Sequence, residues 1–166
     1  IFSLFFLYLF FISELYTNGA MNSIRKMTLE EYPALLRELH KPPKVLYILG
    51  ELPPANYIYL TVVGARRYSE FGIDIIAHKA ALKNNIKTIA IPGSGLREDV
   101  IAPAAHVDIA KRILEAGGAL MSPFPEDTLG ADWTFPVRNE IMAGISHATL
   151  VIEAVRKSGS LITSKH

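Results

Sequence analysis

The sequence predicts an α/β fold in which a parallel sheet is covered by helices on both faces. Apolar runs of strand length alternate with helical segments along the chain, and Gly- or Pro-containing turns follow most of the runs. Strands without a polar face are typical of parallel sheets that are covered on both sides. The 166 residues, half of them hydrophobic and a fifth charged, suffice for one domain with a real core.

Residues 1–20 are an apolar, Phe-rich N-terminal extension. Its apolar run, 1–12, is shorter than the roughly 20 residues of a membrane-spanning helix, and no basic segment precedes it as in a signal peptide. Met21 follows the extension directly. We interpret residues 1–20 as sequence that does not belong to the native protein; a genuine signal or membrane anchor is the alternative.

Residues 21–56 are predicted to form a lead-in segment. Thr28 and Glu31 have the spacing of a capping box ahead of a leucine-rich stretch, which predicts a helix. Pro33 suits the first position of that helix. The apolar run at 45–49, followed by a glycine, predicts a short strand.

Residues 57–166 are predicted to form the main domain. Runs rich in β-branched and aromatic residues that end at Gly or Pro predict strands, and segments with an apolar face of helical period predict helices. The expected order is strand 57–63, helix 73–83, strand 87–91, helix 103–116, strand 119–121, helix 136–145 and strand 149–153.

Composition excludes some classes of site. The chain has no Cys, so disulfides and thiolate metal sites are excluded, and the cytoplasm is the simplest location. The five histidines lack metal-ligand spacing such as His-Glu-x-x-His, so we expect no metal and no cofactor. The formal net charge of +1 neither supports nor excludes a nucleic-acid partner, which depends on a local basic patch.

Candidate binding residues gather in turns that follow strands, because ligands of a parallel sheet bind beyond the carboxyl ends of its strands. Glycines there let a ligand approach the backbone, guanidinium groups bind phosphate oxygens in a forked geometry, and N–H groups at a helix start bind anions. The candidates are Gly64, Arg66, Arg67 and Ser69 after the first main strand, Gly93 after the second, Arg138 and Asn139 on a helix, and Lys157, Ser158, Gly159 and Ser160 after the last.

Each of these candidates has a structural alternative. The glycines and serines can simply form turns and helix caps, and the arginines can be solvated surface side chains. The last turn also lacks the G-x-x-x-x-G-K-[ST] spacing of a P-loop. The residues alone leave open whether these turns bind an anion.

Signals of catalysis are weak. Asp74 and His78 lie four residues apart on one predicted helix, which is more typical of a local pair than of an acid/base dyad. Glu153 ends an apolar strand, where it can face a ligand or organise hydrogen bonds. Trp133 and Phe135 can stack on a base or serve the core.

Five motifs occur in order between residues 32 and 163. They are Tyr32-Pro33 with the run up to Gly50, Val63-Gly64-Ala65-Arg66, Gly72-Ile73-Asp74 with Ala77-His78, Phe135-Pro136-Val137-Arg138-Asn139, and Ser158-Gly159-Ser160-Leu161-Ile162-Thr163. Together they resemble the motifs of the DNA-processing protein A family, also called DprA or Smf. Five ordered motifs are much more specific than one Gly-rich turn.

The resemblance implies a Rossmann-like fold and a protein that binds single-stranded DNA, helps load RecA recombinase during natural transformation and acts as a homodimer. It implies no catalytic reaction, no cofactor and no membrane contact. Residues 57–166 then correspond to a partial Rossmann-like DNA-binding domain. By resemblance, its phosphate pocket is lined by Gly64, Arg66, Arg138, Asn139, Ser158, Gly159 and Ser160. Positive groups and N–H donors suffice to hold a DNA backbone.

The chain also departs from the family pattern. Between Arg66 and Gly72 the family has a further helix and strand, which are absent here, although a crossover between parallel strands needs roughly a dozen residues. Glu140 stands where the family has Arg, and the last helix and strand of the sheet would follow His166. The resemblance therefore implies an incomplete Rossmann-like sheet, with one βαβ portion and the C-terminal end missing.

The leading hypothesis is a DNA-binding protein of competence and DNA recombination rather than an enzyme. One alternative is a Rossmann-like nucleotide hydrolase that uses Glu153 or Asp74, and another is a non-functional fragment. The hydrolase is disfavoured because related phosphoribohydrolases carry a Pro-Gly-Gly-x-Gly-Thr turn, which this chain lacks.

Overall fold

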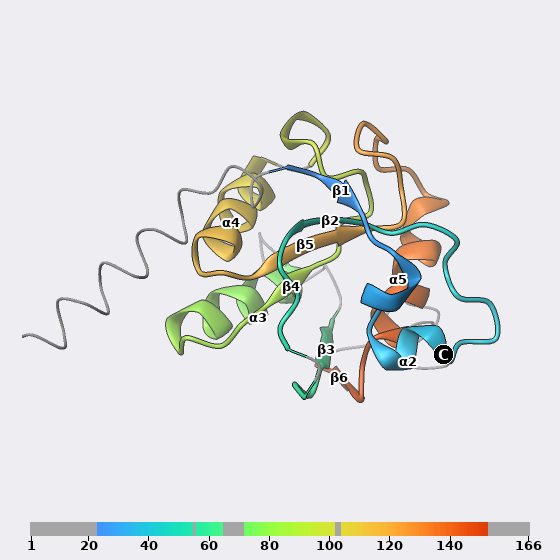
Figure 1. The fold of residues 1–166 in the computed structure, drawn as a ribbon. Coiled ribbons are helices and arrows are strands. Elements are labelled where there is room, and N and C mark those ends of the chain that lie inside the picture. The colour runs from blue at the N-terminus through green and yellow to red at the C-terminus, as the bar shows by residue number, and fades with distance from the viewer. Residues whose placement is uncertain (1–22, 55, 65–71, 102–103, 153–166) are drawn as a thin grey trace, which may run out of the picture.

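The computed structural model describes residues 23–54, 56–64, 72–101 and 104–152, and its fold is α/β, as predicted (Figure 1). The strands are β1 (Arg25–Lys26), β2 (Tyr47–Gly50), β3 (Leu60–Val63), β4 (Ile89–Ala90), β5 (Ala119–Ser122) and β6 (Ala148–Val151). The helices are η1 (Leu29–Glu31), α2 (Ala34–Arg37), α3 (Gly72–Lys83), η2 (Glu98–Val100), α4 (Ala104–Glu115) and α5 (Thr134–Gly144).

The described strands form two sheets, one of four strands in the order β1-β2-β5-β4 and one made of β3 and β6. The pairs β4·β5 and β3·β6 are parallel, as predicted. The helix α4 connects β4 to β5 and supplies the crossover that parallel neighbours need. The lead-in segment adds β1 and β2 in antiparallel orientation, a direction that the sequence pattern did not indicate.

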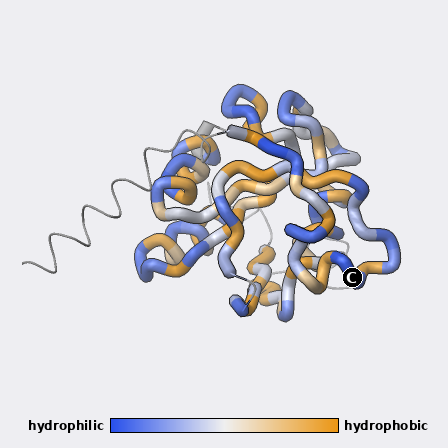
Figure 2. The backbone as a smooth tube through the Cα atoms, viewed as in Figure 1, coloured by the Kyte–Doolittle hydropathy of each residue, from blue (hydrophilic) through white to orange (hydrophobic). Residues whose placement is uncertain are grey.

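Helices cover both faces of the four-stranded sheet, with α3 and α4 on one side and α2 and α5 on the other (Figure 1). All four residues of β5 are buried, and its three apolar side chains alternate between two hydrophobic clusters. Met121 packs with Leu36 and Ile141, whereas Leu120 packs with Ile113. In Figure 2 the apolar strands run through the centre of the molecule.

The lead-in segment shares this core. Leu36, Leu46 and Ile48 are almost fully buried in the same cluster as Met121. The expected capping box is present, and in it the N–H of Thr28 donates to Oε2 of Glu31 at 2.7 Å. It opens only the single turn η1, however, and α2 follows as a separate short helix that starts after Pro33 rather than at it.

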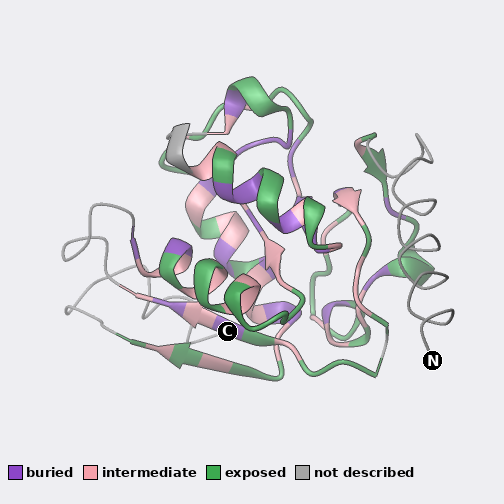
Figure 3. Cartoon of the chain, turned by 90° about the vertical axis from the view of Figure 1, so that its left-hand side faces the viewer, coloured by how far each residue is buried: buried purple, intermediate pink, exposed green. Residues whose placement is uncertain are grey.

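The β3·β6 pair lies at one edge of the molecule, where β6 is largely exposed (Figure 3). Thr61 connects it to α5, because its Oγ1 donates to the carbonyl oxygen of Met142 at 3.0 Å. At the start of the pair, the N–H of His147 donates to the carbonyl oxygen of Tyr59 at 2.9 Å. The extension 1–20 and the segment expected to lack a crossover lie outside the described residues, and the boundary at 56–57 stays a prediction.

Candidate functional site

The chain turns sharply after β4, at Gly93 and Gly95. A Cβ on Gly93 would lie 2.7 Å from Cε1 of Phe135, and a Cβ on Gly95 would lie 2.3 Å from the carbonyl oxygen of Glu126. Both glycines are therefore required by close packing against α5 and the loop before it. This packing brings α5 to the carboxyl end of a parallel strand, where the sequence predicts an anion site.

Thr134 fastens this turn to the start of α5. The residue is fully buried, and its Oγ1 lies 2.6 Å from the carbonyl oxygen of Gly93. The same hydroxyl accepts a hydrogen bond from the N–H of Ala131 at 3.1 Å. Thr134 is not among the predicted site residues, although a threonine at a helix start is the usual signal of such an anchor.

Arg138 places a guanidinium group at the end of β4. Its Nη1 donates to the carbonyl oxygen of Ile91 at 3.2 Å, and its Cζ lies 5.8 Å from the centre of the Phe135 ring. The ring that packs on Gly93 therefore also contacts the arginine. A guanidinium group in this position has the forked geometry that suits phosphate oxygens.

Asn139 and Gly64 are the other two candidate binding residues that the structure describes, and the packing around each one accounts for it. Asn139, next to Arg138 on α5, is 9% exposed, so its amide lies mostly inside the protein. A Cβ on Gly64 would lie 2.4 Å from Cγ1 of Ile73, so the glycine lets the first turn of α3 approach the end of β3. The tight packing of Gly64 does not by itself indicate a ligand.

The carboxyl ends of β3 and β6 lie side by side. Val63 is the register partner of Val151, and the N–H of Ile152 donates to the carbonyl oxygen of Val63 at 2.9 Å. The two segments that follow these ends carry the remaining predicted residues, which lie outside the described residues: Arg66, Arg67, Ser69, Lys157, Ser158, Gly159 and Ser160. The ends of β3 and β6 thus lie on the same edge of the described part of the molecule.

The helix α5 connects this edge with the end of β4. Arg138 and Met142 are one turn apart on α5. The side chain of Arg138 reaches Ile91 after β4, while the carbonyl oxygen of Met142 accepts the hydrogen bond from Thr61 in β3. Arg138 therefore places a positive charge on α5, the helix that contacts both sheets.

The alternative acid/base residues have a structural role in the described part. Nδ1 of His78 lies 2.8 Å from Oγ1 of Thr88, which ties α3 to the segment before β4. Burial lowers the pKa of His78, Asp74 opposes that shift, and His106 adds to it. Glu153 lies outside the described residues. Among the residues that the structure describes, no three His, Asp or Glu side chains gather as metal ligands.

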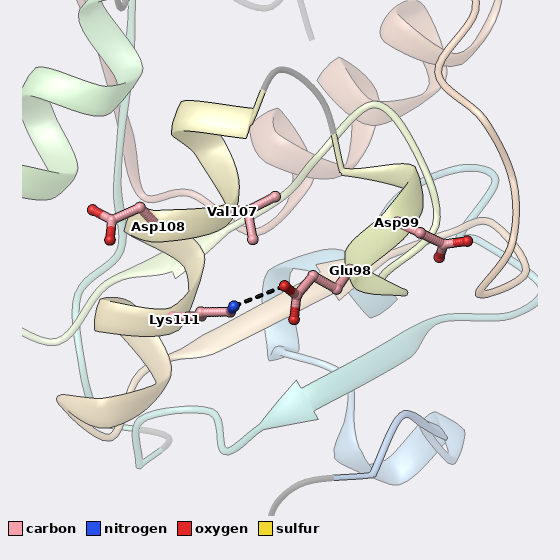
Figure 4. Close-up of a pocket in the computed structure, with 5 residues that line it drawn as sticks. All are labelled: Glu98, Asp99, Val107, Asp108 and Lys111. Atoms are coloured by element: carbon pink, nitrogen blue, oxygen red, sulfur yellow. Dashed lines mark hydrogen bonds and ion pairs between the residues drawn. The ribbon is translucent and has the colours of Figure 1, made fainter.

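An open depression between η2 and α4 contains none of the predicted residues (Figure 4). It is lined by Glu98, Asp99, Val107, Asp108 and Lys111. Glu98 and Lys111 point toward each other and form an ion pair of 2.7 Å, whereas Asp99 and Asp108 point away from them. Three carboxylates against one ammonium group make this surface unsuitable for DNA phosphates.

None of the described helices combines the length and the apolar character that crossing a bilayer requires.

Comparison with known proteins relates this fold to one family. The model of the DNA recombination-mediator protein A family matches residues 23–72 and 70–166. The two matched segments meet at residues 70–72, which is where the sequence predicts the missing crossover. Protein Smf of Escherichia coli strain K12 is 37% identical, with 82% of this chain and 42% of that protein covered.

Two solved structures have the same fold. DNA processing protein A from Streptococcus pneumoniae has a TM-score of 0.74 and 30% identity, with 87% of this chain and 59% of that chain covered. DNA processing protein A from Helicobacter pylori, described for its single-stranded DNA binding mode, has a TM-score of 0.64 and 23% identity, with 85% and 75% covered. These likenesses confirm the Rossmann-like fold. The chain spans about half the length of the curated relatives it matches.

Proposed function

This chain belongs to the DNA recombination-mediator protein A family, and we propose that it binds single-stranded DNA during DNA processing in natural transformation, as a binding protein rather than an enzyme. The observation that carries the proposal is the position of Arg138, whose guanidinium donates to Ile91 at the carboxyl end of β4 and lies over the Phe135 ring that packs on Gly93. The single-stranded DNA binding mode described for the H. pylori structure supports the same substrate.

The proposed binding surface consists of three groups of residues around α5. Arg138, Asn139 and Gly93 lie at the end of β4. Two further groups leave from the ends of β3 and β6 and supply cations, glycines and hydroxyls: Gly64, Arg66, Arg67, Ser69, Lys157, Ser158, Gly159 and Ser160. Such a surface follows a charged backbone and needs no base-specific contact or catalytic group.

The affinity for labelled oligothymidylate, measured by fluorescence anisotropy over a range of salt concentrations, tests the proposal. The single strand should bind more tightly than a duplex of equal length, and the affinity should fall as salt rises. Replacing both Arg66 and Arg138 by Ala should weaken binding about tenfold. It should also reduce the slope of log K against log salt by about 1.4, because each lost phosphate contact of a single strand accounts for about 0.7.

A matched control changes two arginines away from the proposed surface. Arg37 and Arg112 are exposed on α2 and α4, and their joint replacement by Ala lowers the net charge equally. This control should leave the salt slope nearly unchanged. Equal binding by the Arg66/Arg138 variant and the wild-type chain would contradict the proposal.

The family description as a recombination mediator supports RecA as the partner that receives the DNA, and action on DNA supports a cytoplasmic location. Adding this protein to DNA strands precoated with single-strand-binding protein should speed the assembly of RecA on them. RecA ATPase activity measures that assembly.

We expect a homodimer, which sedimentation equilibrium can distinguish from a monomer of 18.4 kDa.

A further inference from the structure

Trp133 is a large aromatic side chain that stays 60% exposed beside the turn after β4. It is the only tryptophan of the chain and directly precedes α5. The next residue, Thr134, is fully buried, and its Oγ1 lies 2.6 Å from the carbonyl oxygen of Gly93. The backbone of Trp133 is therefore fixed one residue away from the contact that joins α5 to the end of β4.

A contact with Phe124 sets the orientation of the indole. The two rings meet edge to face, with centroids 5.4 Å apart and planes 86° apart, and Phe124 is buried. The indole is thus held by one aromatic contact while most of its surface faces solvent. A planar partner can lie against it, and little rotamer freedom is lost on binding because the ring is already positioned.

The charges around Trp133 favour a base over a phosphate. Glu126, Asp127 and Asp132 are exposed acidic side chains on the same loop, and together they repel a phosphate group, although the charge of Arg97 partly offsets Glu126 and Asp127. Arg138 lies about 7.5 Å further along the axis of α5 and about 140° around it, with its guanidinium at the end of β4. A strand whose phosphate lies near Arg138 would reach the neutral indole with a further nucleotide, by passing around the start of α5.

We propose that Trp133 is a stacking platform for a base of bound single-stranded DNA, next to the phosphate contact of Arg138. This inference rests on the proposed function and adds a base-dependent contact to it. Stacking on an aromatic side chain changes affinity by about 5- to 150-fold per base. The contact is tolerant of sequence, because every base has a π-face.

The fluorescence of the single tryptophan provides the test. A short oligothymidylate should quench and shift the emission of Trp133, because a stacked base replaces water at the ring. An abasic oligonucleotide of the same length carries the same phosphates but no bases. It should bind more weakly and leave the emission nearly unchanged.

Variants separate stacking from a structural effect. Trp133→Ala should lower the affinity for oligothymidylate about tenfold and leave the affinity for the abasic strand unchanged. Trp133→Phe keeps an aromatic ring and should therefore retain most of the difference in affinity between the two strands. Leu129→Ala is the matched control, because Leu129 is 70% exposed on the same loop. It should bind both strands as the wild-type chain does.

Two outcomes would overturn the inference in different ways. If Trp133→Ala binds oligothymidylate as tightly as the wild-type chain while Arg66→Ala with Arg138→Ala weakens binding, stacking is wrong and the proposed function stands. If neither strand binds the wild-type chain, both fail. A loss for oligothymidylate and the abasic strand alike would assign Trp133 to the support of the loop and would also overturn stacking.

Discussion

Gly93 and Phe135 pack so closely that only a hydrogen atom fits between them. A Cβ added to Gly93 would lie 2.7 Å from Cε1 and 2.8 Å from Cδ1 of the Phe135 ring. The same ring lies 5.8 Å from the guanidinium carbon of Arg138. The glycine after β4 therefore controls where α5 sits and, through Phe135, where Arg138 is held.

Gly93→Ala should lower the free energy of unfolding by about 1–3 kcal/mol, because it overpacks this contact. It should also weaken DNA binding, since α5 must shift. Gly130→Ala is the milder comparison, because its Cβ would lie 3.2 Å from the carbonyl oxygen and 4.0 Å from the carbonyl carbon of Gly93. Urea unfolding of both variants and of Gly93→Ala with Phe135→Leu checks the cause. If the second substitution does not restore stability, the overpacking explanation is wrong.

Thr134→Val should remove the hydrogen bond to the carbonyl oxygen of Gly93 and cost about 1–3 kcal/mol in the free energy of unfolding. The carbonyl oxygen of Gly93 then faces an apolar methyl group on a fully buried side chain and loses its partner there. Thr134→Ser keeps the hydroxyl and should lose less. Denaturant midpoints at equal m-values measure both effects; a valine variant as stable as the serine variant would count against the role assigned to this hydroxyl.

The unit from β4 through α4 to β5 could be predicted from sequence because its signals are local. The apolar runs, the amphipathic helix and the Gly117-Gly118 stop are all contained within the segment, and Gly117 has the left-handed φ of 68° that favours glycine. The strand 57–63 was predicted too long, since the structure begins it at Leu60. Ile58, which precedes the strand, is 80% exposed. Its apolar side chain contributes to a strand-like sequence pattern, but no other layer of the protein covers it.

The antiparallel direction of β2 and the existence of β1 could not be predicted. A strand pattern contains no information on direction, and Arg25–Lys26 is a polar pair that becomes a strand only because β2 lies beside it. The position of Gly93 at a strand end was readable from sequence. The contact of Arg138 with the end of β4 could not be predicted from local patterns, because its hydrogen bond to Ile91 spans 47 positions in the chain.

Lys87→Met should destabilise the end of α4. The Nζ of Lys87 donates to the carbonyl oxygens of Ala116 at 3.0 Å and Gly117 at 2.9 Å, where a cation complements the helix dipole. The expected loss in the free energy of unfolding is about 0.3–1 kcal/mol, larger at low salt. Lys44→Met, an exposed lysine in a loop, is the control. Equal midpoints for the two variants in low-salt urea unfolding would show that the cap contributes nothing.

The stability of the fold should decrease as the pH falls below about 6.5, the ordinary pKa of histidine, in part because of His78. Burial lowers the pKa of His78 in the folded chain, so the unfolded chain binds the proton more readily between the folded and unfolded pKa values. Stability therefore rises with pH across this window, and the contribution is fully present above it.

His78→Gln should flatten the dependence on pH, because the amide cannot be protonated there. Asp74→Asn should steepen it, since the Asp74 charge opposes the lowering of the His78 pKa. Urea unfolding at a series of pH values between about 5 and 8 measures the slopes. Parallel curves for the wild-type chain and His78→Gln would place the acid sensitivity in other groups. A flatter curve for Asp74→Asn would reverse the sign of the proposed coupling between Asp74 and His78.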